Sequence, residues 1–118
     1  MKILAAHTDK QVLGTVRTVL TDAGRNTVDC TDNHQETSAN LAGTRYDLVV
    51  MQYSLIGKQN IAAIIRLAQS INQHVSVWVV GGSFTQEATE VSLAAGAEKV
   101  LTISNVFSEF QKLGRTNL

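Results

Sequence analysis

The side chains that could do chemistry in this sequence follow three short apolar runs, at residues 2–6, 46–51 and 75–80. Each run has the length and composition of a buried strand. In an open sheet of parallel strands, ligands bind beyond the carboxyl ends of the strands, so the residues after the runs should share one edge. These residues are His7, Thr8, Asp9, Gln52, Gly81, Gly82 and Ser83.

Gln52 ends the central run and decides what this edge can do. A carboxylate at that place could accept a phosphoryl group or bind a metal ion. The neutral amide of Gln52 does neither well. Two interpretations stay open: Gln52 hydrogen-bonds across the cleft and holds it in one state, or it is a polar strand-end residue that meets water.

His7 and Asp9 each allow a functional and a structural interpretation. His7 could bind a ligand or sense pH, or it could be a partly exposed loop histidine. Asp9 could be a residual metal ligand, or it could lie in the first turn of a helix, where its charge suits the helix dipole. A single carboxylate would not hold Mg²⁺ tightly.

Residues 81–83, Gly-Gly-Ser, form a loop that could admit a ligand close to the backbone. A nest of amides before a helix could also bind an anion. The alternative is a plain tight turn.

Composition narrows the class of protein. The 118 residues predict a single domain over 1–118. Ten acids balance ten bases, so we expect neither nucleic acid contact nor a polybasic membrane patch. One cysteine, Cys30, fits reducing, cytoplasmic surroundings. No apolar run approaches the roughly 20 residues of a membrane span.

Hydrophobic periodicity and capping residues predict five strands that alternate with five helices. The strands are expected at 2–6, 27–31, 46–53, 75–80 and 99–103. The first expected helix begins at Thr8 and ends at Gly24, the second runs from 32–33 to 42, and the third spans 61–71. The fourth begins at Ser83 or Thr85 and ends at Gly96, and the fifth begins at Ser104 or Asn105 and ends near Gly114. This alternation predicts an α/β fold, a flavodoxin-like, doubly wound, five-stranded parallel sheet with helices on both faces.

Several segments resemble the receiver domains of bacterial response regulators, which are CheY-like. The segments are Lys-Ile-Leu at 2–4, Arg-Tyr-Asp-Leu-Val-Val at 45–50 and Gly-Ala-Glu-Lys at 96–99. Their order and spacing match a receiver over the full length. The resemblance implies the receiver fold and a part in two-component signal transduction.

The resemblance also implies that the phosphorylation pocket is degenerate. The two acids that hold Mg²⁺ in receivers fall on His7 and Thr8, and the phosphoacceptor aspartate falls on Gln52. The hydroxyl residue of strand four falls on Gly81, and the lysine of strand five falls on Ile103. The aromatic switch residue falls on Val100. We therefore expect a pseudo-receiver with no catalytic residue, no metal site, no Mg²⁺ and no cofactor.

The expected function is regulation through a protein partner or a homodimer, and not an enzymatic activity. The predicted interaction face includes Val100, Phe107 and Phe110, and a residual polar pocket could be formed by Asp9, Ser54 and Ser83. The alternative is a small-molecule-binding module that uses the Gly81-Gly82 loop, because residues 80–87 are similar to a segment of cobalamin-binding domains. A third possibility is that the chain is still phosphorylated, with Asp9 or Thr8 as the acceptor.

Overall fold

The computed structural model describes residues 1–22 and 25–116, and the helix end predicted at Gly24 lies outside this part. Five strands form one sheet in the order β2-β1-β3-β4-β5, and every neighbouring pair is parallel. The strands are β1 (Lys2–Ala6), β2 (Thr27–Thr31), β3 (Leu48–Gln52), β4 (Ser76–Gly81) and β5 (Lys99–Thr102). The helices are α1 (Lys10–Asp22), α2 (His34–Gly43), α3 (Tyr53–Ile56), α4 (Ile61–Ile71), α5 (Gln86–Ala95) and α6 (Ile103–Thr116). The predicted flavodoxin-like parallel fold is confirmed.

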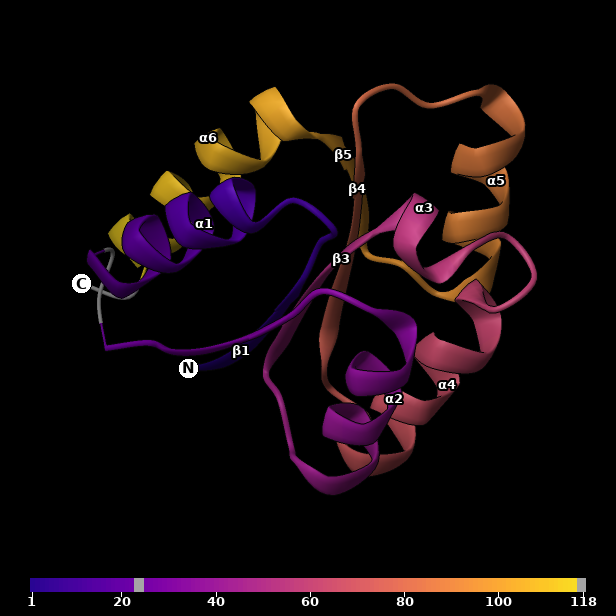
Figure 1. Ribbon diagram of the computed structural model, residues 1–118, viewed down its shortest axis with the longest axis horizontal. Coiled ribbons are helices and arrows are strands. Elements are labelled where there is room, and N and C mark those ends of the chain that lie inside the picture. The colour runs from indigo at the N-terminus through magenta and orange to yellow at the C-terminus, as the bar shows by residue number, and fades with distance from the viewer. Residues whose placement is uncertain (23–24, 117–118) are drawn as a thin grey trace.

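The sheet lies between two layers of helices. Helices α1 and α6 lie side by side on one face, and α2, α3, α4 and α5 cover the other (Figure 1). Successive residues of each central strand point to opposite faces of the sheet and belong to two different hydrophobic cores. Ile3 belongs to the core under α1 and α6, and Leu4 belongs to the core on the other face. This is why the strands are apolar on both faces and show no polar alternation.

The capping residues predicted for both ends of α5 are confirmed. Thr85 is the N-cap of α5, and its hydroxyl accepts a hydrogen bond from the backbone N–H of Ala88. Gly96 ends the same helix in the left-handed conformation, with φ of 111°. That conformation favours glycine because it has no Cβ.

Three local predictions were wrong. The sixth helix, α3, follows β3 directly, so strand 46–53 ends at Gln52. Asp9, and not Thr8, caps α1, because the Asp9 carboxylate accepts from the backbone N–H of Gln11. Helix α6 begins at Ile103, which was expected in the last strand, and continues past Gly114.

Helix α6 is fixed to the sheet by an aromatic stack and an ion pair. The ring of Phe110 stacks on Trp78, with 5.8 Å between centroids. Glu109, whose side chain is 16% exposed, pairs with Lys99 of β5 and with Lys112. These two ammonium groups lower the pKa of the Glu109 carboxyl. None of the described helices has the length and apolar character needed to cross a membrane.

Candidate functional site

Gln52 and Thr8 join the carboxyl ends of β3 and β1. The side-chain oxygen Oε1 of Gln52 accepts two hydrogen bonds from Thr8, one from the backbone N–H at 2.9 Å and one from the hydroxyl at 3.0 Å. Both donors come from the loop after β1, which lies next to β3 in the sheet. These bonds provide the contact that the first interpretation of Gln52 requires. That the contact holds the cleft in one state stays a prediction.

His7 and Asp9 complete the loop between β1 and α1. Nδ1 of His7 accepts a hydrogen bond from the backbone N–H of Asp9 at 3.0 Å. An imidazole nitrogen that accepts must carry no proton, so the neutral ring holds its proton on Nε2. Burial lowers the pKa of His7, and the nearby Asp9 carboxylate partly opposes this.

The same contacts engage Nδ1 of His7 and one carboxylate oxygen of Asp9, two atoms that could otherwise bind a metal ion. Nδ1 of His7 is engaged, and Nε2 is protonated in the neutral tautomer. The Asp9 carboxylate caps α1, accepting from Gln11 N at 2.8 Å and Val12 N at 3.4 Å. Among residues 1–22 and 25–116, no group of three or more His, Cys, Asp or Glu side chains is placed to hold a metal ion.

His7 and Ile103 meet at a small cavity on the α1 and α6 side of the sheet. Its volume is about 10 Å³, close to that of one water-sized sphere. Apart from His7, apolar side chains line it: Ala5, Ala6, Val12, Leu13, Val16, Val50, Val80, Ile103 and Val106. The position that the resemblance gives to a lysine therefore contributes to an apolar wall.

Gly81 lies on the other side of the sheet, under the ring of Phe84. A Cβ atom added at Gly81 would lie 3.0 Å from Cζ of that ring. The ring of Phe84 also meets Tyr53 of α3 edge to face, with 6.0 Å between centroids. The glycine is thus explained by the close approach of a ring from its own chain. Phe84 thus covers the side of Gly81 on which a Cβ would lie, whereas a Cβ added at the exposed Gly82 would meet nothing within 4 Å.

The three residues predicted for a residual polar pocket come from separate segments. Asp9, Ser54 and Ser83 are exposed on three different segments, the β1–α1 loop, α3 and the β4–α5 loop. The shared polar pocket of these three residues stays a prediction.

The predicted interaction face is divided. Val100 and Phe107 are half-buried, and Phe110 is fully buried between α6 and the sheet. Phe110 therefore belongs to the core and is removed from the face. Phe107 packs edge to face on Phe110, with 5.9 Å between centroids.

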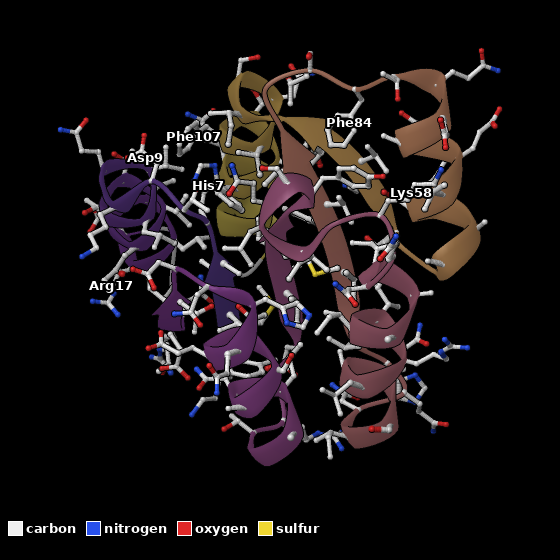
Figure 2. All side chains as sticks on the ribbon, turned by 45° about the vertical axis from the view of Figure 1, so that its right-hand side comes forward. His7, Asp9, Arg17, Lys58, Phe84 and Phe107 are labelled. Atoms are coloured by element: carbon white, nitrogen blue, oxygen red, sulfur yellow. The ribbon has the colours of Figure 1, made fainter. Side chains whose placement is uncertain are left out.

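Phe84 is the site residue that the sequence interpretation missed. Figure 2 shows it near the same end of the molecule as His7, Asp9 and Phe107. Its signal was an apolar ring directly after the Gly-Gly-Ser loop, where a solvated turn would carry polar residues. The direction in which the ring points is not encoded in any local period.

The sequence matches no family model and no curated protein. Solved structures are similar in fold. A CheY-like response-regulator receiver domain from Methanospirillum hungatei has a TM-score of 0.78 at 17% identity, covering 98% of this chain and 94% of that one. The receiver domain of a sensor histidine kinase from Pseudomonas aeruginosa, with a magnesium ion coordinated in its active-site cleft, has a TM-score of 0.74 at 18% identity, covering 97% of each chain. A putative pilus assembly protein from Burkholderia thailandensis has a TM-score of 0.72 at 18% identity, covering 98% of each chain. The fold of this chain is the receiver fold.

Proposed function

We propose that this chain is a receiver-fold module that acts in signal transduction or regulation through protein–protein contact, without phosphoryl transfer. The observation that carries the proposal is the pair of hydrogen bonds from Thr8 to Gln52 Oε1. At the position that the resemblance assigns to the phosphoacceptor, the side chain is an amide, and its oxygen is already used to tie β1 to β3. An amide oxygen is a poor nucleophile and brings no charge to a cation.

The surroundings of Gln52 support the same proposal. Phosphoryl transfer needs a cation or a fixed donor to stabilise the developing charge. Ile103 gives an apolar wall where the resemblance expects lysine. Thr8 and His7 stand where it expects the two acids, and both are engaged in the loop. An input that favours one state of the module would then be a protein or a ligand.

One structural relative widens the range of roles. The Burkholderia protein is named for pilus assembly, and its fold is similar over 98% of this chain. This name supports the idea that a receiver fold can work inside a protein assembly. For this chain we propose contact with a protein partner, a second copy of the chain, or both.

The direct test is thermal melting with and without Mg²⁺ and beryllofluoride, which mimics a phosphoryl group on aspartate. We expect no change in Tm, and no gain of about 80 Da when acetyl phosphate and Mg²⁺ are added. The Pseudomonas receiver domain, which coordinates magnesium, is the positive control under the same conditions. A Mg²⁺-dependent rise in Tm or a stable adduct on Asp9 or Thr8 would contradict the proposal.

The same assay separates an interaction module from a small-molecule-binding module. A ligand that binds the folded state raises Tm by mass action. Cobalamin is the informative ligand, because residues 80–87 resemble part of a cobalamin-binding domain. With Phe84 over Gly81, we expect cobalamin to leave Tm unchanged. A concentration-dependent rise that Phe84→Ala enhances would support the small-molecule alternative.

A further inference from the structure

The outer surface of α1 is a second feature of the molecule, separate from the pocket. Helix α1 lies at the outside of its layer, next to α6 (Figure 1). Its inward residues Leu13, Val16 and Leu20 are buried in the core. The exposed residues of α1 are Lys10, Gln11, Gly14, Thr15, Arg17, Thr18, Thr21 and Asp22. The guanidinium of Arg17 donates to the carbonyl of Val28 in β2 at 3.3 Å.

This surface is open and nearly flat around Gly14. A shallow, open depression of about 520 Å³ is lined by Gln11, Gly14, Thr15, Thr18 and Val19. A Cβ atom added at Gly14 would meet nothing within 4 Å. The folded chain itself therefore does not require glycine here, although glycine in a helix costs about 0.5–1 kcal/mol relative to alanine.

The threonines make the depression less polar than its composition indicates. The hydroxyls of Thr15 and Thr18 donate to the carbonyls of Gln11 and Gly14, each at 3.0 Å. The hydroxyl of Thr21 donates in the same way to the carbonyl of Arg17. Because the three hydroxyls are satisfied within the helix, their methyl groups are free to pack against a neighbour.

The charges at the two ends of this surface are complementary under a two-fold rotation. Lys10 and Asp22 are both exposed, and neither forms an ion pair within residues 1–22 and 25–116. Along the helix, the midpoint between Lys10 and Asp22 is Val16, which is also the midpoint between Gly14 and Thr18. An antiparallel second copy would therefore place Lys10 against Asp22 at both ends, and Gly14 against Thr18 on both sides of the centre.

We propose that this α1 surface, residues 10–22, is a docking site for α1 of a second copy of this chain, related by a two-fold axis. A self-complementary patch is what such an axis requires. Small residues at the centre allow the helix axes to approach to roughly 8 Å. The zero net charge of the chain adds no overall repulsion between copies.

The dimer should be weak. A contact of one helix per partner is smaller than the roughly 800 Å² per partner of a standard interface. We therefore expect a dissociation constant of about 0.1–1 mM for the dimer. A larger assembly could strengthen this contact by raising the effective concentration of the two copies. This surface is distinct from the pocket, so the proposal stands whether or not the pocket can be phosphorylated.

The first test is sedimentation velocity across this concentration range. Gly14→Gln fills the centre with a neutral side chain and favours the helix of the monomer. We expect it to weaken dimerisation by at least about tenfold. Gly43→Gln is the matched control: it is an exposed helical glycine on α2, and its added Cβ also meets nothing within 4 Å. The control should dimerise like the unmodified chain.

The second test exchanges the charges. Lys10→Glu or Asp22→Lys alone should weaken the dimer several-fold, and the double variant should recover it. Each substitution suits the helix dipole, with an acid in the first turn or a base in the last, so neither should destabilise the monomer. A monomer at every concentration, a dimer equally tight in Gly14→Gln, or no recovery in the double variant would overturn the proposal.

Discussion

The two faces of the sheet are closed by different kinds of contact at the edge where β1, β3 and β4 end. On the α1 and α6 face, the closure is polar, because Gln52 Oε1 accepts both donors of Thr8. On the face covered by α3 and α5, it is apolar, because the ring of Phe84 lies on Gly81 and against Tyr53. The same edge thus combines a hydrogen-bonded half and a packed half.

This difference shows which property of each half matters. A hydrogen-bonded contact depends on the chemistry of its acceptor and tolerates small changes of volume. A packed contact depends on volume and shape. Substitutions that change only one of these properties should therefore affect the two halves differently.

The largest effect is expected in the packed half, from Gly81→Thr. Its Cβ would lie 3.0 Å from Cζ of Phe84, closer than ordinary van der Waals contact. Overpacking of this kind costs about 1–3 kcal/mol of unfolding free energy. Urea denaturation measures the loss.

Phe84→Ala is the partner variant for this test. On its own it should destabilise the chain, because the ring loses its packing with Tyr53. Combined with Gly81→Thr, it should restore part of the loss, because the clash is gone. Strictly additive losses would show that the ring does not explain the glycine.

A smaller effect is expected in the hydrogen-bonded half, from Gln52→Ala. The two Thr8 donors lose their acceptor and are left to water, since Thr8 is exposed. The expected cost is about 1 kcal/mol. Faster hydrogen exchange of the Thr8 backbone N–H is the specific readout.

Gln52→Glu is the control, because it keeps an oxygen at the same distance along the side chain. At neutral pH the Glu carboxylate accepts both hydrogen bonds, and charge-assisted bonds are the stronger ones. We expect stability at least equal to that of the unmodified chain. A loss as large as that of Gln52→Ala would mean that the amide N–H₂ of Gln52, and not its oxygen, carries the contact.

The strands and the long helices were predictable because their signals are local. Apolar runs predicted β1, β3 and β4, and the spacing of Ile61, Ile64, Ile65, Ala68 and Ile71 predicted α4 with its observed bounds. The short helix α3 was missed, since the four residues Tyr53–Ile56 are too few for a period to show. Thr8 and Asp9 are both good N-caps, and a distant residue, Gln52, decided between them.

The candidate site was predictable as a place but not as a set of contacts. The position of Gln52 after a buried strand indicated the edge at which it lies. Whether its oxygen would meet water or Thr8 depends on the pairing of β1 with β3, which brings together residues 44 positions apart. Phe84 was missed for the same reason, because the contact of its ring with Gly81 depends on the path of the β4–α5 loop.

The smallest effect expected in the hydrogen-bonded half is a pH-dependent loss of stability caused by His7. Burial lowers the pKa of His7 in the folded chain below its ordinary value of 6.5. Between that value and the lowered pKa, the unfolded chain binds more protons than the folded chain, so stability falls as the pH falls. Protonated Nδ1 could not accept from Asp9 N–H, so the loop would lose that bond.

Urea midpoints measured from pH 7.5 to pH 5 should therefore decline, and His7→Gln should flatten the part of the decline that belongs to this ring. The carboxylate of Asp9 faces His7 and partly opposes the shift, so Asp9→Asn should lower the pKa of His7 further, deepen the part of the decline that belongs to this ring and extend it to lower pH. The ¹⁵N NMR chemical shifts of the His7 imidazole at neutral pH should show the proton on Nε2. A proton on Nδ1 would contradict the bond from Asp9 and leave Thr8 and Gln52 as the only fixed contact of the polar half among the described residues.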